Sequence, residues 1–325
     1  MSSTPPDATP VLVADIGGTH ARAGIVTRPG TAPDAVFKRR TRDFDGLAGF
    51  LGSALEDLCD GYRPRSALCA VASPVDRDPI ELTNAGWRFS RTGTADALGL
   101  DRVEFVNDWV AQGWATTQIT DDHLHTIQPG RADPMAPRLA LGPGTGLGSA
   151  LVTPGSIGWQ VYATEGGHIS FAPRTAREWA IVERIQDRFN HCSAERLASG
   201  IGIETVYQTL HQIDGTRPRH TRAEEIAQAA LAGDPIGAEV IQTMTAALGS
   251  AAGDLALATG ARGGVYLGGG VIPLLGNAFD WGLFGGRFTA KGRFRDYLES
   301  IPIHAMTHPA PALYGLSVYL TQSRM

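Results

Sequence analysis

Five short stretches of this 325-residue chain contain clustered glycines, acidic residues or both, and these residue types suit phosphate and sugar chemistry. The first is Asp15-Ile16-Gly17-Gly18-Thr19, which follows an apolar run at 11–14. Glycines allow backbone N–H groups to turn toward a phosphate, and the threonine hydroxyl adds a donor. An aspartate at a strand end can hold, directly or through water, the Mg²⁺ that accompanies a nucleoside triphosphate. The alternative is an ordinary hairpin turn, where Gly-Gly pairs are common.

The second stretch is Gly142-Pro143-Gly144-Thr145-Gly146-Leu147-Gly148. Its four glycines and one threonine in seven residues exceed what a tight turn requires. It is not a Walker A loop, because no Gly-Lys-Ser/Thr follows, and its spacing differs from the G-x-G-x-x-G of dinucleotide-binding folds. A phosphate site without a lysine depends on backbone dipoles and a metal ion.

The third stretch is Asn107-Asp108, which directly follows an expected strand and precedes an expected helix. An aspartate at this place can simply stabilise the positive N-terminal end of the helix. The functional interpretation is a general base at a strand end, where α/β folds usually bind their ligands.

The fourth stretch is Glu165-Gly166-Gly167-His168, with Glu195 thirty residues after Glu165. Polar side chains on a bare backbone suit sugar hydroxyls, although a single Glu or His is more often a surface group. A metal site is another possibility, but no cysteine and no second histidine stands at the spacing that such a site needs. The fifth stretch, Gly268-Gly269-Gly270, permits flat contact with an adenine ring or a ribose, or is only a flexible turn.

Alternating strands and helices must position these stretches, and this alternation predicts an α/β architecture. Expected strands cover 11–14, 21–26, 36–41, 67–72, 103–106, 139–141, 148–152 and 264–267. Expected helices cover 47–58, 177–188, 203–211, 223–231 and 312–320, with two more beginning near 107 and 235.

The two glycine-threonine stretches also suggest a duplicated domain. Aligning Thr19 with Thr145 aligns Gly18 with Gly144, and it places Asp15 opposite Leu141. Two strand–turn–strand units 126 residues apart indicate an internal repeat, and two independent hairpins are the alternative.

Composition excludes several classes of protein. Hydrophobic residues make up 43% and charged residues 19%, as in ordinary globular proteins. With a net charge of −5 and no dense basic run, nucleic acid and anionic membrane are not expected partners. The three cysteines form no CxxC pair, which favours a reducing cytoplasm without a cysteine zinc site. The first ten residues predict a frayed tail and not a signal peptide. No stretch predicts a transmembrane helix, because the most apolar one, 244–261, is too short and too polar.

Taken together and in this order, six motifs resemble the bacterial glucokinases, of the hexokinase and actin-like superfamily. They are VADIGGTHAR (13–22), EFVNDW (104–109), GPGTGLG (142–148), EGGHISFAP (165–173), ERLASGIGI (195–203) and YLGGGV (266–271). Segments 291–294 and 307–316 also look like that family, so the resemblance covers about 11–320.

This resemblance implies an actin-like, ribonuclease H-like sugar kinase of two α/β domains with a cleft between them. The small domain would comprise 1–118 and 309–325, and the large domain 119–308. The implied reaction is ATP-dependent phosphorylation of glucose to glucose 6-phosphate, with Mg²⁺, in a cytoplasmic homodimer. Domain closure triggered by the correct sugar would limit hydrolysis of ATP.

The resemblance also implies the roles of single residues. Asp108 would be the general base on the sugar 6-hydroxyl. The sugar hydroxyls would be held by Asn107, Asp108, Glu165, His168 and Glu195. The ATP phosphates would lie against Asp15, Gly17, Gly18, Thr19, Gly144, Thr145 and Gly146, with Mg²⁺ at Asp15, and adenosine near Gly268, Gly269 and Gly270.

One position departs from the family pattern, since relatives commonly have Gly-Gly-Thr-Asn where this chain has His20. Three other functions stay open at this stage: a kinase for another hexose, a sugar-binding regulator without catalysis, and an actin-like ATPase. A regulator usually carries an added DNA-binding segment, for which we expect no room before the first glycine turn. The sugar-binding set argues against the ATPase. Zinc, which a related kinase family binds through a cysteine-rich motif, is not expected.

Overall fold

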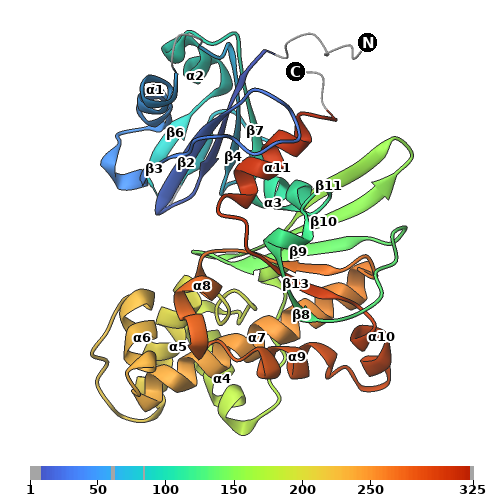
Figure 1. The fold of residues 1–325 in the computed structure, drawn as a ribbon. Helices are drawn as coiled ribbons and strands as arrows, with labels where there is room; N and C mark the ends of the chain where they lie inside the picture. Colours follow the sequence, from blue (N-terminus) through green and yellow to red (C-terminus); the bar gives the residue numbers. More distant parts are fainter. Residues whose placement is uncertain (1–8, 60–62, 83–84, 323–325) are drawn as a thin grey trace. The chain divides into compact units, whose positions relative to one another are not determined.

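A computed structural model describes residues 9–59, 63–82 and 85–322 of the chain (Figure 1). The expected frayed tail therefore lies, up to residue 8, outside the described residues. Two compact units emerge from the contacts within the chain. Unit 1 comprises Met1–His123, Ser156–Ala163 and His308–Met325, and unit 2 comprises Leu124–Gly155 and Thr164–Thr307. Within the described ranges, no helix has the length and apolar character needed to cross a membrane.

Unit 1 is built on a five-stranded sheet with the order β3-β2-β1-β4-β7. These strands are β1 (Val11–Ile16), β2 (His20–Val26), β3 (Phe37–Arg40), β4 (Ser66–Val71) and β7 (Arg102–Asn107). β1, β4 and β7 run parallel, while β2 and β3 are antiparallel to their neighbours. A separate hairpin pairs β5 (Ile80–Leu82) with β6 (Trp87–Phe89).

The central strand β1 is buried on both faces, as its unbroken apolar sequence predicts. Leu12 and Ile16 pack into one core together with residues of α1 (Leu47–Leu58) and α2 (Arg91–Leu98). Val11 and Val13 pack into another core with residues of α3 (Asp108–Ala115) and α11 (Pro311–Tyr319). Because side chains alternate along a strand, Asp15 shares the face of Val11 and Val13.

The second of these cores depends on a close approach between α11 and α3. Gly315 of α11 lies against the backbone carbonyl of Ala111, and a Cβ at position 315 would fall on that oxygen. The glycine therefore lets the C-terminal helix pack directly on the helix that begins at Asp108. Residues from the two ends of the chain thus fix the position of α3.

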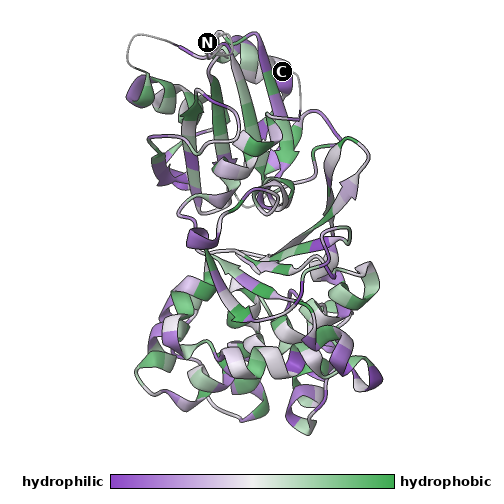
Figure 2. Cartoon of the chain, turned by 45° about the vertical axis from the view of Figure 1, so that its right-hand side comes forward, coloured by the Kyte–Doolittle hydropathy of each residue, from purple (hydrophilic) through white to green (hydrophobic). Residues whose placement is uncertain are grey.

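Unit 2 contains five strands in the order β10-β9-β12-β13-β8. They are β8 (Leu124–Gln128), β9 (Arg138–Pro143), β10 (Leu147–Gly155), β12 (Val265–Leu267) and β13 (Ile303–Met306). β9, β12 and β13 run parallel, with β10 and β8 antiparallel to them. The strand β11 (Gly158–Thr164) follows β10, and most of it belongs to the segment grouped with unit 1. In Figure 2 hydrophobic residues are frequent in the strands, whereas several of the connecting turns are hydrophilic.

Helices form the core of unit 2 around one long central helix. They are α4 (Ala176–Phe189), α5 (Gly200–Ile213), α6 (Ala223–Leu231), α7 (Pro235–Thr259), α8 (Val271–Leu275), α9 (Trp281–Thr289) and α10 (Arg295–Glu299). Gly249 and Gly253 of α7 face the backbone of α9, where any side chain would clash. The buried Arg287 of α9 donates hydrogen bonds to Glu178 of α4 and Ser250 of α7, so its charge is paired.

The two sheets share the internal repeat that the sequence predicts. In both units an antiparallel hairpin is followed by two strands parallel to its first strand, so β1, β2, β4 and β7 correspond to β9, β10, β12 and β13. The alignment of Asp15 with Leu141 is wrong, however. The last pair of the first hairpin is Ile16–Ala21 and that of the second is Pro143–Leu147. The second turn is therefore one residue shorter, and Asp15 corresponds to Gly142.

Most expected elements are present within one to three residues of their expected ends, and the helices 47–58 and 223–231 have the expected bounds. The expected turn at 142–146 is shorter, because β9 continues through Gly142 and Pro143. The sequence reasoning missed β5, β6, β8, β11, β13 and the helices α2, α8, α9 and α10. The changes of unit at 123/124 and 307/308 lie near the expected domain boundaries at 118 and 308.

Candidate functional site

The carboxyl ends of the parallel strands in unit 1 gather three of the predicted site segments at one edge of the sheet. Ile16 of β1 pairs with Val71 of β4, which in turn pairs with Asn107 of β7. Two strand spacings separate Ile16 from Asn107, a distance of about 10 Å. The turn after Asp15 and the Asn107–Asp108 pair are thus neighbours, although more than eighty residues separate them in the sequence.

The turn at 17–20, called here the first turn, is held by its carbonyl groups. The Thr41 hydroxyl donates to the Gly17 carbonyl at 2.8 Å, and the Thr41 backbone N–H donates to the Thr19 carbonyl at 3.0 Å. By contrast, the N–H groups of Gly18 and Thr19 have no acceptor within the part of the chain that the structure describes. Free amides of this kind form the concave anion sites known from other phosphate-binding turns.

Asp15 is the acidic group beside the first turn. Its side chain is 18% exposed and lies 3.4 Å from the Arg22 guanidinium. Burial raises the pKa of the Asp15 carboxyl above its ordinary value, and the positive charge of Arg22 opposes this shift. The carboxylate is therefore partly shielded from solvent at the place where the sequence predicts Mg²⁺.

Mg²⁺ needs few protein ligands when a nucleotide supplies the others, so one carboxylate fits this ion. Over the described ranges, no group of three or more His, Cys, Asp or Glu residues is placed to hold a metal. Asp15 beside free amides therefore suits a metal shared with phosphate rather than a metal bound by the protein alone.

Asn107 and Asp108 form the N-terminal end of α3. The Trp109 backbone N–H donates both to the Asn107 side chain at 2.9 Å and to Asp108 Oδ1 at 3.0 Å. Asn107 is thus the N-cap, and Asp108 is the acidic residue of the first helical turn, which is the structural role that the sequence left open for this aspartate. Both residues are half-buried, and the cap fixes one Asp108 oxygen relative to the sheet edge.

The turn at 144–146, called here the second turn, joins β9 to β10 in unit 2. Its carbonyls are also occupied: the N–H groups of Gly200 and Ile201, at the start of α5, donate to Gly144 and Thr145 at 2.9 and 3.2 Å. The N–H groups of Thr145 and Gly146 find no acceptor among the described residues. Like the first turn, the second turn presents free amides.

The side chain of Glu195 contacts the second turn. Its Oε2 accepts a hydrogen bond from the Leu147 N–H at 2.9 Å, and a Cβ on Gly146 would clash with the same oxygen. Its backbone N–H donates to the Gly167 carbonyl at 2.9 Å. This residue, predicted to bind sugar, therefore also connects the second turn to the Glu165–His168 segment.

Glu165 and His168 lie at the two ends of a short 3-10 helix, Gly166–His168. Both side chains are exposed, with His168 Nε2 3.8 Å from Glu165 Oε2. The buried Ser149 hydroxyl accepts from the Gly166 N–H at 3.1 Å and bonds the Thr164 hydroxyl at 2.7 Å. Ser149 thus fixes the backbone of this short helix, and the exposed carboxylate and imidazole groups are available to hydroxyl ligands.

The glycines at 268–270 follow β12 at the same end of the unit 2 sheet. Gly268 N–H donates to the Leu141 carbonyl at 3.0 Å. Gly269 has a φ of +88° and lies against Pro143, where a Cβ would clash with the backbone. The backbone conformation and the close contact with Pro143 therefore require glycine at position 269.

Each unit therefore brings together its own share of the predicted residues. Unit 1 gathers Asp15, Gly17, Gly18, Thr19, Asn107 and Asp108. Unit 2 gathers Gly144, Thr145, Gly146, Glu165, His168, Glu195, Gly268, Gly269 and Gly270. The sequence reasoning missed the residues that hold these groups, above all Thr41 and Ser149. Neither belongs to a motif, and only its pairing with a distant turn reveals its role.

A comparison with known families gives a match over nearly the whole chain. The family model described as "Glucokinase" matches residues 12–323. The chain belongs to the glucokinase family. Membership of the glucokinase family confirms the resemblance on which the sequence analysis relied, and the class of enzyme that it implied.

Individual relatives agree with the glucokinase family assignment. The glucokinase of Paramagnetospirillum magneticum is 41% identical over 97% of this chain and 98% of its own length. A bifunctional protein of Paraburkholderia xenovorans is 38% identical over 96% of this chain, which spans 49% of that longer protein. The crystal structure of a glucokinase from an Antarctic psychrotroph matches 97% of this chain with a TM-score of 0.80 and 31% identity. The predicted α/β fold of a two-part sugar kinase is confirmed.

Proposed function

We propose that this chain transfers the γ-phosphoryl group of ATP to the 6-hydroxyl of glucose, giving glucose 6-phosphate. The family assignment supports the reaction. The observation that carries the proposed chemistry is the shared sheet edge in unit 1, where Asp108 neighbours the free amides of the first turn. A group that accepts a proton and a set of donors for phosphate then lie at the same edge of one sheet, about 10 Å apart.

Asp108 acts as the general base in this proposal. Its carboxylate accepts the proton of the sugar 6-hydroxyl as that oxygen attacks the phosphorus and the bond to ADP breaks. The hydrogen bond from the Trp109 N–H to Asp108 Oδ1 orients the group without neutralising it. General-base assistance of this kind typically contributes about 10²–10⁴-fold in rate.

The two glycine turns hold the phosphates through the N–H groups of Gly18, Thr19, Thr145 and Gly146. Donors directed at the place where negative charge develops are effective because they need no reorganisation during the reaction. Asp15 would hold Mg²⁺, which supplies positive charge to the phosphate oxygens when it is bound. In phosphoryl transfer, such positioning and charge stabilisation do most of the catalysis.

In this proposal the sugar hydroxyls are held by Asn107, Asp108, Glu165, His168 and Glu195. Closure triggered by the correct sugar would exclude water as a competing acceptor. Adenosine would lie against Gly268, Gly269 and Gly270. Gly269 has its own backbone requirement, so the neighbouring Gly268 and Gly270 are the better probes of this contact.

The test measures ADP release with ATP and Mg²⁺ across glucose, mannose, fructose, N-acetylglucosamine and no sugar. We expect strong turnover with glucose and little without sugar. Preference for another sugar would replace glucose as the substrate, and sugar-independent release would favour an ATPase. Glucose binding without release would favour a regulator.

Asp108→Asn provides the mechanistic test, because the asparagine oxygen can still accept from the Trp109 N–H. We expect kcat to fall by about 10²–10⁴-fold while glucose binding stays measurable. Asp101→Asn is the matched control, since Asp101 is an exposed aspartate just before the same strand. Near-normal turnover of Asp108→Asn would refute the base assignment.

We further propose that the enzyme works as a cytoplasmic homodimer. Its three cysteines are unpaired, and two of them, Cys69 and Cys192, are buried, which suits a reducing compartment. Light scattering on the purified chain measures the mass directly. A monomer at micromolar concentration would contradict the dimer.

A further inference from the structure

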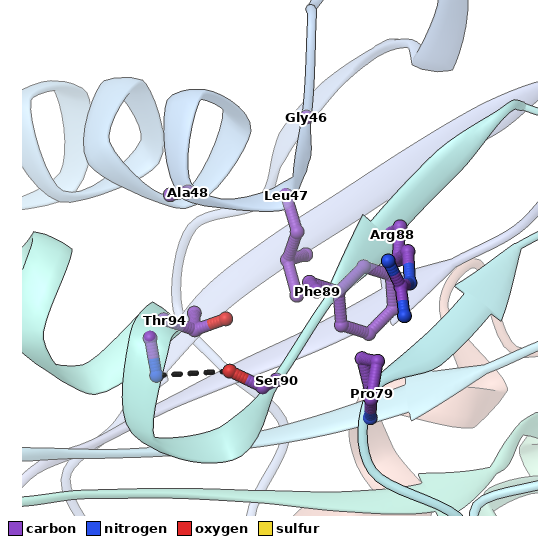
Figure 3. Close-up of a pocket in the computed structure, with 9 residues that line it drawn as sticks. Gly46, Leu47, Ala48, Pro79, Arg88, Phe89, Ser90 and Thr94 are labelled. Atoms are coloured by element: carbon purple, nitrogen blue, oxygen red, sulfur yellow. Dashed lines mark hydrogen bonds between the residues drawn. The ribbon is translucent and has the colours of Figure 1, made fainter.

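A cavity of about 560 Å³ lies within unit 1, and none of the residues that line it is among those assigned above to the substrates. It is formed by the start of α1, the end of β6 and the first turn of α2 (Figure 3). Cavities of about 300–1,000 Å³ are the usual size of small-molecule sites. Its lining contains no acidic side chain, which sets it apart in a chain of net charge −5.

The N-terminus of α1 opens into this cavity without a cap. Gly46 is the N-cap and has no side chain to accept a hydrogen bond, and the first turn contains no acidic residue. The N–H groups of Leu47 and Ala48, which line the cavity, have no acceptor among the described residues. Such groups carry the partial positive charge of a twelve-residue helix.

The N-terminus of the neighbouring helix α2, unlike that of α1, is capped by side chains. The Ser90 hydroxyl accepts from the Gly93 N–H at 3.1 Å, and Asp78 accepts from the Arg91 N–H at 3.2 Å. The dashed line in Figure 3 runs to the Ser90 hydroxyl. Only one of the two helix ends at this cavity is therefore left for an external acceptor.

Thr94 supplies an independent sign that the cavity takes a polar ligand. The residue is only 3% exposed, yet its hydroxyl has no hydrogen-bond partner in the described part of the chain. Figure 3 shows this hydroxyl directed toward Leu47 and Phe89, into the space that these residues line. The hydroxyl oxygen does not belong to the fully buried, unpartnered polar atoms of the described residues, so it is accessible from the cavity and can donate to an acceptor bound there.

The remaining walls combine a cation with apolar surface. The Arg88 guanidinium is 3.4 Å from Glu81, and both side chains are about 70% exposed, so this surface pair is weak and the guanidinium can turn to a ligand. Phe89, Leu47 and Pro79 form the apolar part. The site thus combines N–H and hydroxyl donors, a positive charge and nonpolar surface, with Arg88 beside Phe89 and Pro79 in Figure 3.

We propose that this cavity binds a small oxyanion, a phosphate ester or a carboxylate, carried on a compact apolar group. The amides of Leu47 and Ala48, the Thr94 hydroxyl and the Arg88 guanidinium hold the oxyanion, and Phe89 and Leu47 cover the apolar group. This site is separate from the proposed kinase site, and its existence does not depend on that function.

Calorimetric titration tests the proposal with phenyl phosphate, benzoate and inorganic phosphate as probes. The full chain is saturated with glucose and a non-hydrolysable ATP analogue, so that the proposed kinase site does not contribute. We expect phenyl phosphate or benzoate to bind at least about tenfold more tightly than inorganic phosphate, because the apolar group adds buried area. The better of the two shows which oxyanion the site prefers. No binding of either aromatic probe would overturn the proposal.

Three variants locate the binding. Arg88→Gln should weaken binding at least about tenfold and Thr94→Val several-fold, because each removes one interaction with the oxyanion. Ala48→Asp should abolish binding and raise the melting temperature slightly, since its carboxylate caps α1 in place of the ligand. Arg102→Gln, an exposed arginine of the same unit, is the control and should bind normally. Unchanged affinity in Arg88→Gln or in Thr94→Val would overturn the site.

Discussion

The two glycine turns have the same place in two similar sheets, but different parts of the chain hold them. The first turn is held by Thr41, just beyond the edge strand β3. The second turn rests on the start of α5 and on the carboxylate of Glu195. The two strand–turn–strand units therefore both present free amides, but different contacts support them.

This difference assigns the two turns different parts in the proposed reaction. Within the described residues, Thr41, which holds the first turn, forms no hydrogen bond with a residue predicted to bind sugar. The second turn is bonded to Glu195, which is itself predicted to bind sugar and whose backbone joins the Gly166–His168 segment. We therefore expect sugar and ATP sites to be coupled through the second turn and not through the first.

Among the variants that test this coupling, Glu195→Ala has the largest expected effect. Loss of the carboxylate frees the Leu147 N–H and removes a sugar ligand, so KM should rise for both ATP and glucose. A hydrogen bond to a charged group is worth about 1.5–3 kcal/mol, which corresponds to about 10–150-fold for each substrate. Steady-state kinetics with each substrate varied in turn measures both values.

Two variants serve as controls for Glu195→Ala. Glu165→Ala should raise KM for glucose alone, because Glu165 has no bond to the second turn. Glu195→Gln keeps an oxygen for the Leu147 N–H and should largely restore KM for ATP. If KM for ATP were unchanged in Glu195→Ala, the proposed coupling through the second turn would be wrong.

Gly146→Ala tests the contact between the second turn and Glu195 by adding a side-chain atom to the turn. The added Cβ clashes with the Glu195 carboxylate, which is the movable end of a flexible side chain, so Glu195 turns away and loses its bond to the Leu147 N–H, at a cost of about 0.5–1.5 kcal/mol in stability. Gly144→Ala is the matched control, because nothing lies within 4 Å of its Cβ. We expect thermal unfolding to distinguish the two variants, with KM for ATP raised in Gly146→Ala. Equal melting temperatures would contradict the packing described here.

Hydrophobic periodicity predicted the elements that carry the turns because β1, β4, β9 and β12 are short apolar runs bounded by glycine or serine. It missed β13 and β8, whose sequences Ile303–Met306 and Leu124–Gln128 mix polar and apolar residues. Their exposed or half-buried positions give no clear alternation. Pairing with a distant strand defines them, and a local pattern does not contain that information.

The motifs of the site could be predicted from the sequence, but the residues that hold these motifs in place could not. Asp15, Asp108 and the two turns stand at strand ends, where spacing alone suggests chemistry. Thr41 contacts the first turn across twenty-four residues, and Glu195 contacts the second across forty-eight. Such contacts depend on how the strands pair, so no local pattern could assign them.

Thr41→Val should have a smaller effect, confined to the first turn. The side chain is fully buried, and the substitution leaves the Gly17 carbonyl without its donor while the backbone bond to Thr19 remains. We expect a loss of about 1–2 kcal/mol in stability and a few-fold rise in KM for ATP. KM for glucose should not change, whereas Glu195→Ala should raise it. If Thr41→Val raised KM equally for ATP and glucose, the proposed difference between the two turns would be wrong. Thr41→Ser, which retains the hydroxyl, is the control.

The smallest expected effect is the pH response of His20, which has no titratable counterpart in the second turn. Partial burial and the positive charges of Lys38, Arg22 and Arg40 lower the pKa of His20 below its ordinary value of 6.5. As the pH falls, the unfolded chain therefore binds a proton at this position before the folded chain does. The free energy of unfolding consequently decreases as the pH drops below about 6.5, until the folded chain is protonated too. His20→Asn removes this contribution, and its melting temperature should fall less between pH 7 and pH 5 than that of the parent chain. The difference between the chains at pH 8, where both are neutral at this position, gives the packing change alone. An NMR titration that placed the pKa of His20 at or above 6.5 would show that the basic residues around the first turn do not act on it.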